Sequence, residues 1–226
     1  MISDFISLLF PHYCFTCREN LVKGEEYLCS HCRLILPKTN VHKLSENPLL
    51  KRYGGLLPIE QFFAYLKFTK GGKVQKIMEK LKYENCPEIG TILGQWYGAD
   101  LKETGFINQF DLIVPVPLHK SKLMKRGYNQ SDYFAKGLSN AFDVPWDGAV
   151  LNRVLKNETQ TKKNRSERFK NVTGIFELAK KEDVKDKRIL LVDDVITTGA
   201  TLFASAQPLL SGGCGSISLA TLAIAQ

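Results

Sequence analysis

The chain has 226 residues, of which 44% are hydrophobic and 24% charged, and its formal net charge is +8. This content predicts a soluble globular protein with a packed core, and no apolar run reaches the roughly 20 residues of a transmembrane helix. The positive charge favours anionic partners, namely polyphosphates, nucleic acid or an acidic membrane surface, and charge alone does not choose among them.

The first ten residues do not resemble a signal peptide. They lack a basic start, include Asp4 and are cut off by Pro11 before an apolar core can develop. Phe5, Leu8 and Leu9 share one helical face, which predicts a short amphipathic helix. A cytoplasmic protein is therefore expected.

Four of the six cysteines form two Cys-x-x-Cys pairs, Cys14 with Cys17 and Cys29 with Cys32. Four thiolates within so short a segment are typical of a tetrahedral zinc site. The alternatives are two disulfides, which a cytoplasmic setting disfavours, and a redox pair, which needs only one Cys-x-x-Cys. A closed four-thiolate site leaves no position for substrate, so Zn²⁺ is expected to be structural.

We predict an N-terminal, zinc-ribbon-like module over residues 1–45, a linker over 46–60 and a second domain over 61–226. The linker segment shows no sustained periodicity, whereas the second domain alternates between strand and helix spacing. Predicted strands cover residues 62–68, 111–117, 151–155, 174–178, 189–192 and 216–223, and predicted helices cover 73–81, 87–101, 128–141 and the segment from 200 to 210. This alternation predicts an α/β, Rossmann-like fold, a mainly parallel sheet with helices on both faces. Pro208 is expected to kink or shorten the last helix near Gln207.

A basic turn follows the strand predicted at 111–117. It holds Lys120, Lys122, Lys125 and Arg126, and such a run is usually solvated surface. Beside a phosphate site the same cations suit a diphosphate, because arginine forks match its oxygens. The segment 153–170 is also basic, polar and long enough to close over a ligand as a lid.

Two adjacent carboxylates, Asp193 and Asp194, follow the apolar run 189–192. The carboxyl ends of parallel strands form the crevice where such sheets bind ligands. Ionised carboxylates are hydrogen-bond acceptors, which suits a pair of sugar hydroxyls.

Residues 197–201, Thr-Thr-Gly-Ala-Thr, come next and open a predicted helix. A helix start presents unpaired N–H groups and the positive end of the dipole, and Gly199 permits a tight turn, so a phosphate can bind there. Thr197, Thr198 and Thr201 add hydroxyl donors. The alternative is a strand-to-helix connection in which these residues only cap the helix, but capping needs one such residue.

The run 188–201 closely resembles the phosphoribosyl pyrophosphate (PRPP) signature of type I phosphoribosyltransferases. The resemblance implies that fold, with Asp193 and Asp194 on the ribose hydroxyls and the loop 197–201 around the 5-phosphate. It also implies PRPP and Mg²⁺ as ligand and cofactor.

Residues 111–130, the run Leu81-Lys82-Tyr83 and the four cysteines together resemble ComF proteins, also called ComFC, of bacterial competence systems. Arg126 to Gln130 match the family's Arg-Gly-aromatic-Asn-Gln, whereas Ser121-Lys122 replaces its usual earlier basic residue. A looser motif of that family is matched by Arg153, Thr159, Gln160, Arg168, Asn171 and Phe176. The resemblances together imply PRPP binding by Asp193, Asp194, Thr197, Thr198, Gly199, Ala200, Thr201, Lys82, Tyr83 and Arg126.

Two functions follow as hypotheses. In the first, the chain binds PRPP and transfers ribosyl phosphate with release of pyrophosphate, and Asp193 and Asp194 are catalytic because they stabilise positive charge on the ribose. In the second, it is a non-catalytic competence component that binds single-stranded DNA. Because Gly71-Gly72-Lys73 is not a complete nucleotide-binding phosphate loop, ATP-driven transport requires a partner helicase. A purely structural zinc adaptor would leave the loop 197–201 unused.

Overall fold

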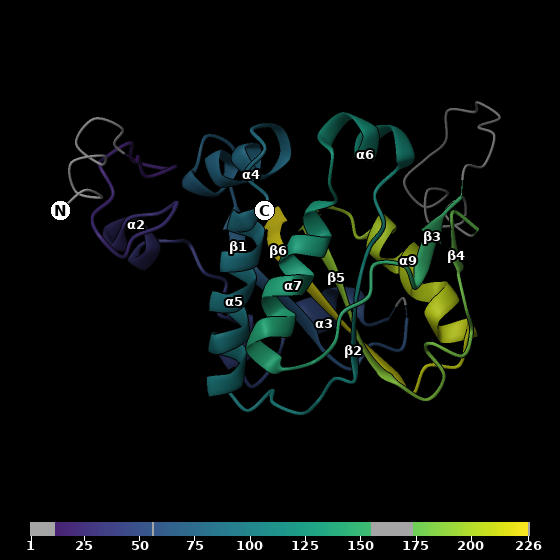
Figure 1. Ribbon diagram of the computed structural model, residues 1–226. Helices are drawn as coiled ribbons and strands as arrows, with labels where there is room; N and C mark the ends of the chain where they lie inside the picture. Colours follow the sequence, from purple (N-terminus) through teal and green to yellow (C-terminus); the bar gives the residue numbers. More distant parts are fainter. Residues whose placement is uncertain (1–11, 56, 155–173, 226) are drawn as a thin grey trace.

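The computed structural model describes residues 12–55, 57–154 and 174–225. Its main sheet has four parallel strands in the order β1-β6-β5-β2. The strands are β1 (Phe62–Phe68), β2 (Leu112–Pro115), β5 (Arg188–Ile196) and β6 (Ser216–Ala225). Because all four are parallel, their carboxyl ends lie at one edge of the sheet (Figure 1).

Helices cover both faces of this sheet, as expected for parallel strands. The helices of the sheet domain are α3 (Pro48–Tyr53), α4 (Lys73–Tyr83), α5 (Glu88–Glu103), α6 (Lys120–Arg126), α7 (Gln130–Phe142) and α9 (Ala200–Ser211). One apolar cluster joins α4, α5 and α7 to one face, and a second joins α3 and α9 to the other (Figure 1). Adjacent residues of β5 divide between the clusters, since Leu190 faces the first and Leu191 the second. The α/β, Rossmann-like fold predicted from the sequence, a mainly parallel sheet with helices on both faces, is confirmed.

Helices α5 and α7 touch almost backbone to backbone. A Cβ built on Gly137 would lie 2.1 Å from the carbonyl oxygen of Thr91, and one on Gly94 would lie 2.5 Å from that of Phe134. Glycine at both positions therefore permits the close approach that fixes α7, whose first turn faces the site described below.

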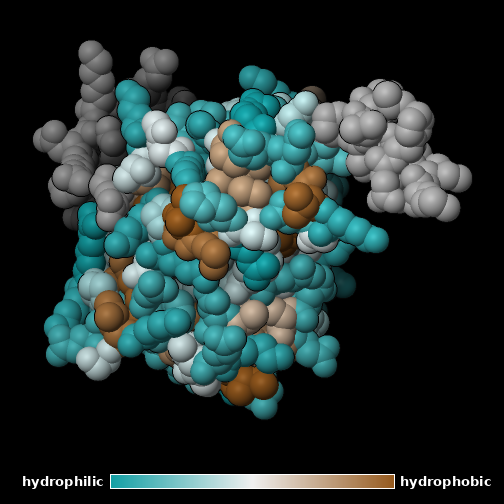
Figure 2. All heavy atoms as spheres, turned by 90° about the vertical axis from the view of Figure 1, so that its left-hand side faces the viewer, coloured by the Kyte–Doolittle hydropathy of each residue, from teal (hydrophilic) through white to brown (hydrophobic). Residues whose placement is uncertain are grey.

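The N-terminal segment packs onto the same side of the sheet as α4. We call residues 12–36, with the short helix α2 (Ser30–Leu34), the four-cysteine module. Cys14 and Cys32 are fully buried in the apolar cluster that contains α4 and α5. On the face that includes this module, hydrophobic side chains form separate patches in a mainly hydrophilic surface (Figure 2).

The segment predicted to be a linker, 46–60, contains α3, and η1 (Val41–Lys43) lies just before it. Asn47 caps α3 by accepting hydrogen bonds from the next N–H groups, and Tyr53 is buried in the second cluster. The structure thus places an ordered helix where no periodicity was recognised. The predicted domain limits stay a prediction.

Other elements differ from expectation. Strands β3 (Leu151–Arg153) and β4 (Phe176–Leu178) pair antiparallel in a sheet of their own. Helix α6 forms where only a basic turn was expected, and α9 contains Pro208 and continues to Ser211, so it is not shortened near Gln207. The helix predicted over the first ten residues and most of the lid predicted over 153–170 lie outside the described residues. None of the helices in the described part of the chain has the length and apolar character needed to span a bilayer.

Candidate functional site

A pocket of about 170 Å³ opens at the carboxyl edge of the sheet. It lies between the end of β5, the loop after β2, the first turn of α7 and the last turn of α4. We call it the carboxylate pocket, and its charged lining residues are Lys82, Lys122, Arg126, Arg153, Asp193 and Asp194. Four cations around two carboxylates leave an excess of positive charge, which suits a polyanionic ligand.

The two carboxylates belong to the strand itself. The pairing of β2 ends at Pro115, opposite Val192, while β6 still pairs with Asp193 and beyond. β5 therefore continues beyond the end of its pairing with β2, and its acidic side chains reach the pocket from inside the strand instead of following it. The expected place at the sheet edge is confirmed, although the strand is longer than predicted.

Hydrogen bonds fix the orientation of both acids. The Ser131 hydroxyl donates to Asp193 Oδ1 at 3.1 Å, and the Asp194 N–H donates to the same oxygen at 2.8 Å. The Lys82 ammonium lies 2.8 Å from Asp194 Oδ2. Burial, together with the adjacent charge of Asp194, raises the pKa of Asp193 to about 7. At neutral pH Asp193 and Asp194 together therefore carry less than two full negative charges.

The loop after β5 forms a second, smaller cavity beside the first, lined by Asp193 and residues 195–202. Gly199 precedes α9 with φ of +84°, and a Cβ there would lie 2.5 Å from the ring of Phe203. This position requires glycine for both reasons. Because α9 begins at Ala200, its first turn lines this cavity and brings backbone N–H groups and the positive end of the helix dipole to it.

The first turn of α7 is held to the loop after β2. The Asn129 side chain accepts a hydrogen bond from the Ser131 N–H at 3.3 Å and donates to the Val116 carbonyl at 3.1 Å. It also donates to Asp132 at 2.6 Å, and burial raises the pKa of Asp132 to about 6. Asn129 thereby fixes the position from which Ser131 reaches Asp193.

The last turn of α4 meets the basic turn. The Arg126 guanidinium lies over the Tyr83 ring at 5.3 Å and donates to Gln130 Oε1 at 2.6 Å. The Tyr128 hydroxyl donates to the Leu81 carbonyl at 2.7 Å. Contacts between residues about 45 positions apart in the sequence thus hold Lys82 and Arg126 on the same side of the pocket.

Most residues predicted for the site are brought together. Those that line the carboxylate pocket are Lys82, Arg126, Asp193, Asp194 and Thr201, and those that line the adjoining cavity include Thr197, Thr198, Gly199 and Ala200. Tyr83 lies outside both linings and contacts Arg126. Ser131 was missed, and its one signal in the sequence is that it directly follows the Arg-Gly-Tyr-Asn-Gln run.

The cysteines form a separate site in the four-cysteine module. The sulfur atoms of Cys14, Cys17, Cys29 and Cys32 all lie within 4.8 Å of one another, and those of Cys17 and Cys29 are 3.7 Å apart. That distance is far longer than a disulfide bond and close to the ~3.8 Å edge of a tetrahedron with metal–sulfur bonds of about 2.3 Å. All six cysteines of the chain are unpaired. The four clustered thiols therefore fit a metal such as zinc.

Comparisons with known proteins agree with this architecture. Residues 129–225 match the model of the phosphoribosyl transferase domain family. With the parallel sheet and the loop after β5, this match defines a type I phosphoribosyltransferase-like protein. The chain is 31% identical to "Competence protein F" of Haemophilus influenzae over 85% of this chain and 88% of that protein. It is 27% identical to "DNA utilization protein YhgH" of Escherichia coli over 93% of this chain and 96% of that protein. The chain belongs to the ComF/ComFC family.

Among solved structures, a hypoxanthine phosphoribosyltransferase from Staphylococcus aureus matches with a TM-score of 0.37 and 19% identity. The match covers 66% of this chain and 71% of that one.

Proposed function

We propose that this protein binds PRPP with Mg²⁺ in the carboxylate pocket, with the 5-phosphate on the loop 197–201. The observation that supports this most is that two cavities adjoin, since Asp193 and Thr201 line both the carboxylate pocket and the smaller cavity at the start of α9. Along the two cavities, backbone and hydroxyl donors come first, then the two carboxylates, then the cations. A ligand in which a sugar diol lies between a phosphate and a diphosphate matches this order.

Each group has a role in this proposal. Asp193 and Asp194 accept hydrogen bonds from the ribose 2- and 3-hydroxyls, and Ser131 holds Asp193 in place. Lys82 and Arg126 face the diphosphate. Tyr83 helps to hold the guanidinium of Arg126 in this position. Bound Mg²⁺ would neutralise diphosphate charge, and the hard oxygen donors of Asp193 and Asp194 are those that this ion prefers.

The same arrangement suits ribosyl transfer. When the bond between C1 of the ribose and the diphosphate oxygen breaks, the bonding electrons leave with pyrophosphate and positive charge develops on the sugar. Carboxylates below the sugar and cations around the diphosphate stabilise both charges, and no side-chain nucleophile is needed. An acceptor, or water, then takes the ribosyl phosphate.

Calorimetric titration with PRPP and Mg²⁺ tests binding, and a pyrophosphate-release assay on the same sample tests turnover. Binding with release identifies an enzyme, and binding without release identifies a sensor or carrier of PRPP. Absence of binding would contradict the proposal.

We further infer that the four-cysteine module binds structural Zn²⁺. The four sulfurs fill a tetrahedral shell, so no coordination position is left for a substrate. Unpaired thiols in such a site suit a reducing compartment, which supports a cytoplasmic location.

A second candidate function is binding of single-stranded DNA during DNA uptake. Helix α6 has no buried residue and presents its lysines beside the pocket, where Tyr83 is 67% exposed and Met124 85% exposed. Exposed aromatic groups beside cations are typical of single-strand binding, and the relatives' names concern competence and DNA utilization. A partner helicase would supply the ATP-driven step.

Charge reversal at Lys122 and Lys125 tests this second function and should weaken single-strand binding at low salt. Affinity that neither falls with salt nor responds to these changes would contradict it. Lys162, Lys163 and Arg165, which also suit this role, lie outside the described residues.

A further inference from the structure

Helix α4 connects the four-cysteine module to the carboxylate pocket. Near one end, the Lys76 ammonium donates to the carbonyl oxygen of Thr16 at 3.1 Å. Thr16 is 3% exposed and stands inside the first Cys-x-x-Cys, between Cys14 and Cys17. Six residues later in the same helix, Lys82 reaches Asp194. A helix is stiff over this distance of about 9 Å, so a displacement at Lys76 is transmitted to Lys82.

The segment Cys14–Cys17, which contains Thr16, also has contacts with the sulfur of Cys14. The Thr16 hydroxyl lies 3.4 Å from Cys14 Sγ, and the Cys29 N–H donates to the same sulfur at 3.4 Å. A metal bound to the four thiols would therefore fix the backbone position of Thr16. The carbonyl that Lys76 contacts belongs to this same residue, so its position would then depend on the four cysteines.

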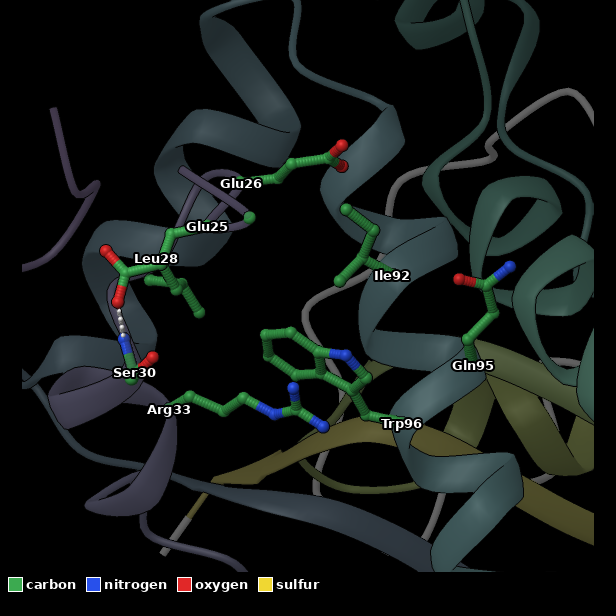
Figure 3. Close-up of a pocket in the computed structure, with 9 residues that line it drawn as sticks. Glu25, Glu26, Leu28, Ser30, Arg33, Ile92, Gln95 and Trp96 are labelled. Carbon is green, nitrogen blue, oxygen red and sulfur yellow. Dashed lines mark hydrogen bonds between the residues drawn. The ribbon is translucent and has the colours of Figure 1, made fainter. Parts of the chain in front are cut away.

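Additional contacts join the module to α4 and α5. The Lys80 ammonium lies over the Phe15 ring at 5.3 Å, and the Arg33 guanidinium lies over the Trp96 ring at 4.2 Å. Figure 3 shows Arg33 extending from the module toward Trp96 across a cavity of about 230 Å³. These contacts and the apolar cluster that Cys14 and Cys32 share with α4 and α5 hold the module against the helices.

The other end of α4 carries one cation of the carboxylate pocket, Lys82, and contacts a second, Arg126. Lys82 pairs with Asp194, and Tyr83 supports Arg126. The Leu81 carbonyl, which accepts the hydrogen bond of Tyr128, fixes the basic turn to the same helical turn. A shift of α4 would thus move Lys82 directly and Arg126 through Tyr83 and Tyr128.

We propose that the four-cysteine module positions Lys82 and Arg126 for ligand binding through α4, and that Lys76 is the positioning residue that joins them. The module then has a role in the pocket besides stabilising the fold. This inference rests on the proposed function, because it assigns Lys82 and Arg126 to the ligand.

The test compares Lys76→Met with Lys73→Met, which removes the same charge from the same helix one turn earlier. Calorimetry with PRPP and Mg²⁺ should show about fivefold weaker binding for Lys76→Met and less than about twofold for Lys73→Met. Both are then made in a Lys82→Met background, where Lys76→Met should have little further effect, because the residue that it positions is gone. An unchanged dissociation constant for Lys76→Met, or equal weakening in both backgrounds, would overturn the inference.

Hydrogen exchange gives a readout that needs no ligand. Lys76→Met, and removal of the metal by a chelator, should speed amide exchange in the last turn of α4 and leave the middle of α7 unchanged. If the wild-type protein fails to bind PRPP, the proposed function fails on its own account. The positioning by α4 is then decided by the exchange data, and unaltered exchange at residues 80–84 would refute it.

Discussion

The ammonium group of Lys82 lies 2.8 Å from Asp194 Oδ2, and both side chains are about one-fifth exposed. Lys82 therefore forms an ion pair with one of the two acids. A diphosphate would compete for this lysine, while sugar hydroxyls would take its place on Asp194. Lys82→Met should weaken PRPP binding by about tenfold, because the ligand loses a cation and Asp194 loses its partner. Calorimetry measures this, with Lys73→Met as the control.

Ligand binding should depend on pH through Asp193. The pKa of this carboxyl is raised to about 7, first by burial and then by the charge of Asp194. Bound Mg²⁺ and sugar hydroxyls favour the ionised form, so binding should release a proton near pH 7 and strengthen from pH 6 to pH 8. Calorimetric titrations in two buffers of different ionisation enthalpy measure the number of protons released, because the observed binding enthalpy differs between the buffers by that number times the difference in ionisation enthalpy. Release that is absent in wild type, or that persists in Asp193→Asn, would contradict this assignment.

The same shift predicts a gain in stability for Asp193→Asn. Between the unfolded pKa of about 4 and the folded pKa, the folded protein keeps a proton that the unfolded chain has lost. The contribution of Asp193 to stability therefore falls as pH rises through this window. Asn avoids that cost, so the variant should melt about 2–4 °C higher than wild type at pH 8 and close to wild type at pH 4. Thermal unfolding of both proteins from pH 4 to pH 8 checks whether the melting temperature of the variant rises relative to wild type as predicted.

Ser131→Ala should weaken PRPP binding about three- to tenfold without unfolding the protein. The hydroxyl donates to Asp193 Oδ1, and its loss lets that carboxylate turn and raises its pKa further. Ser139→Ala, on the same helix and away from the pocket, is the control. A matching loss of affinity in both variants would show that α7 is perturbed as a whole.

Gly199→Ala should abolish binding of the 5-phosphate. The added methyl group meets the Phe203 ring at 2.5 Å and forces a residue with φ of +84° into an unfavourable region. Gly213 has φ of +85° with no atom within 4 Å of an added Cβ, so Gly213→Ala imposes the same backbone strain without the clash. Binding of inorganic phosphate is followed by the NMR shifts of the backbone amides of residues 197–201. These shifts should be lost in Gly199→Ala and kept in Gly213→Ala.

The cysteine site predicts one zinc ion per chain. Replacing Cys14 and Cys29 by Ser should release the metal and lower the melting temperature, because half of the thiolate ligands are removed. Cys86→Ser, outside the cluster, is the control and should keep the metal. Metal analysis of the purified wild-type protein that finds no zinc would refute the assignment.

The sequence predicted the parts of the site that are local in the chain. Asp193, Asp194 and the loop 197–201 are contiguous, so their spacing alone indicates a sugar-phosphate site. Arg126 was singled out by the charge of the basic turn and Lys82 by the family resemblance, but nothing in their own neighbourhood shows that α4 and the basic turn meet. Ser131 could not be found because its contact with Asp193 joins residues 62 positions apart.

The fold shows a similar division. The long strands and helices were recognised from periodicity, whereas the three-residue strands β3 and β4 have too few side chains to indicate their partners. Helix α6 was missed because it has no apolar face, and its ends depend on His119 as the N-cap and on Gly127 in the left-handed conformation. Burial of Leu209 in the second cluster helps to offset the hydrogen bond that Pro208 removes, so α9 continues.

The most direct test of the account is calorimetric titration of wild type and of the double variant Asp193→Asn with Asp194→Asn, using PRPP and Mg²⁺. We predict saturable binding to wild type, at least a hundredfold loss in the double variant, and a folded variant by circular dichroism. Wild-type affinity retained in the double variant would contradict the assignment of the two carboxylates to the ribose. Absence of binding to wild type would contradict the account as a whole.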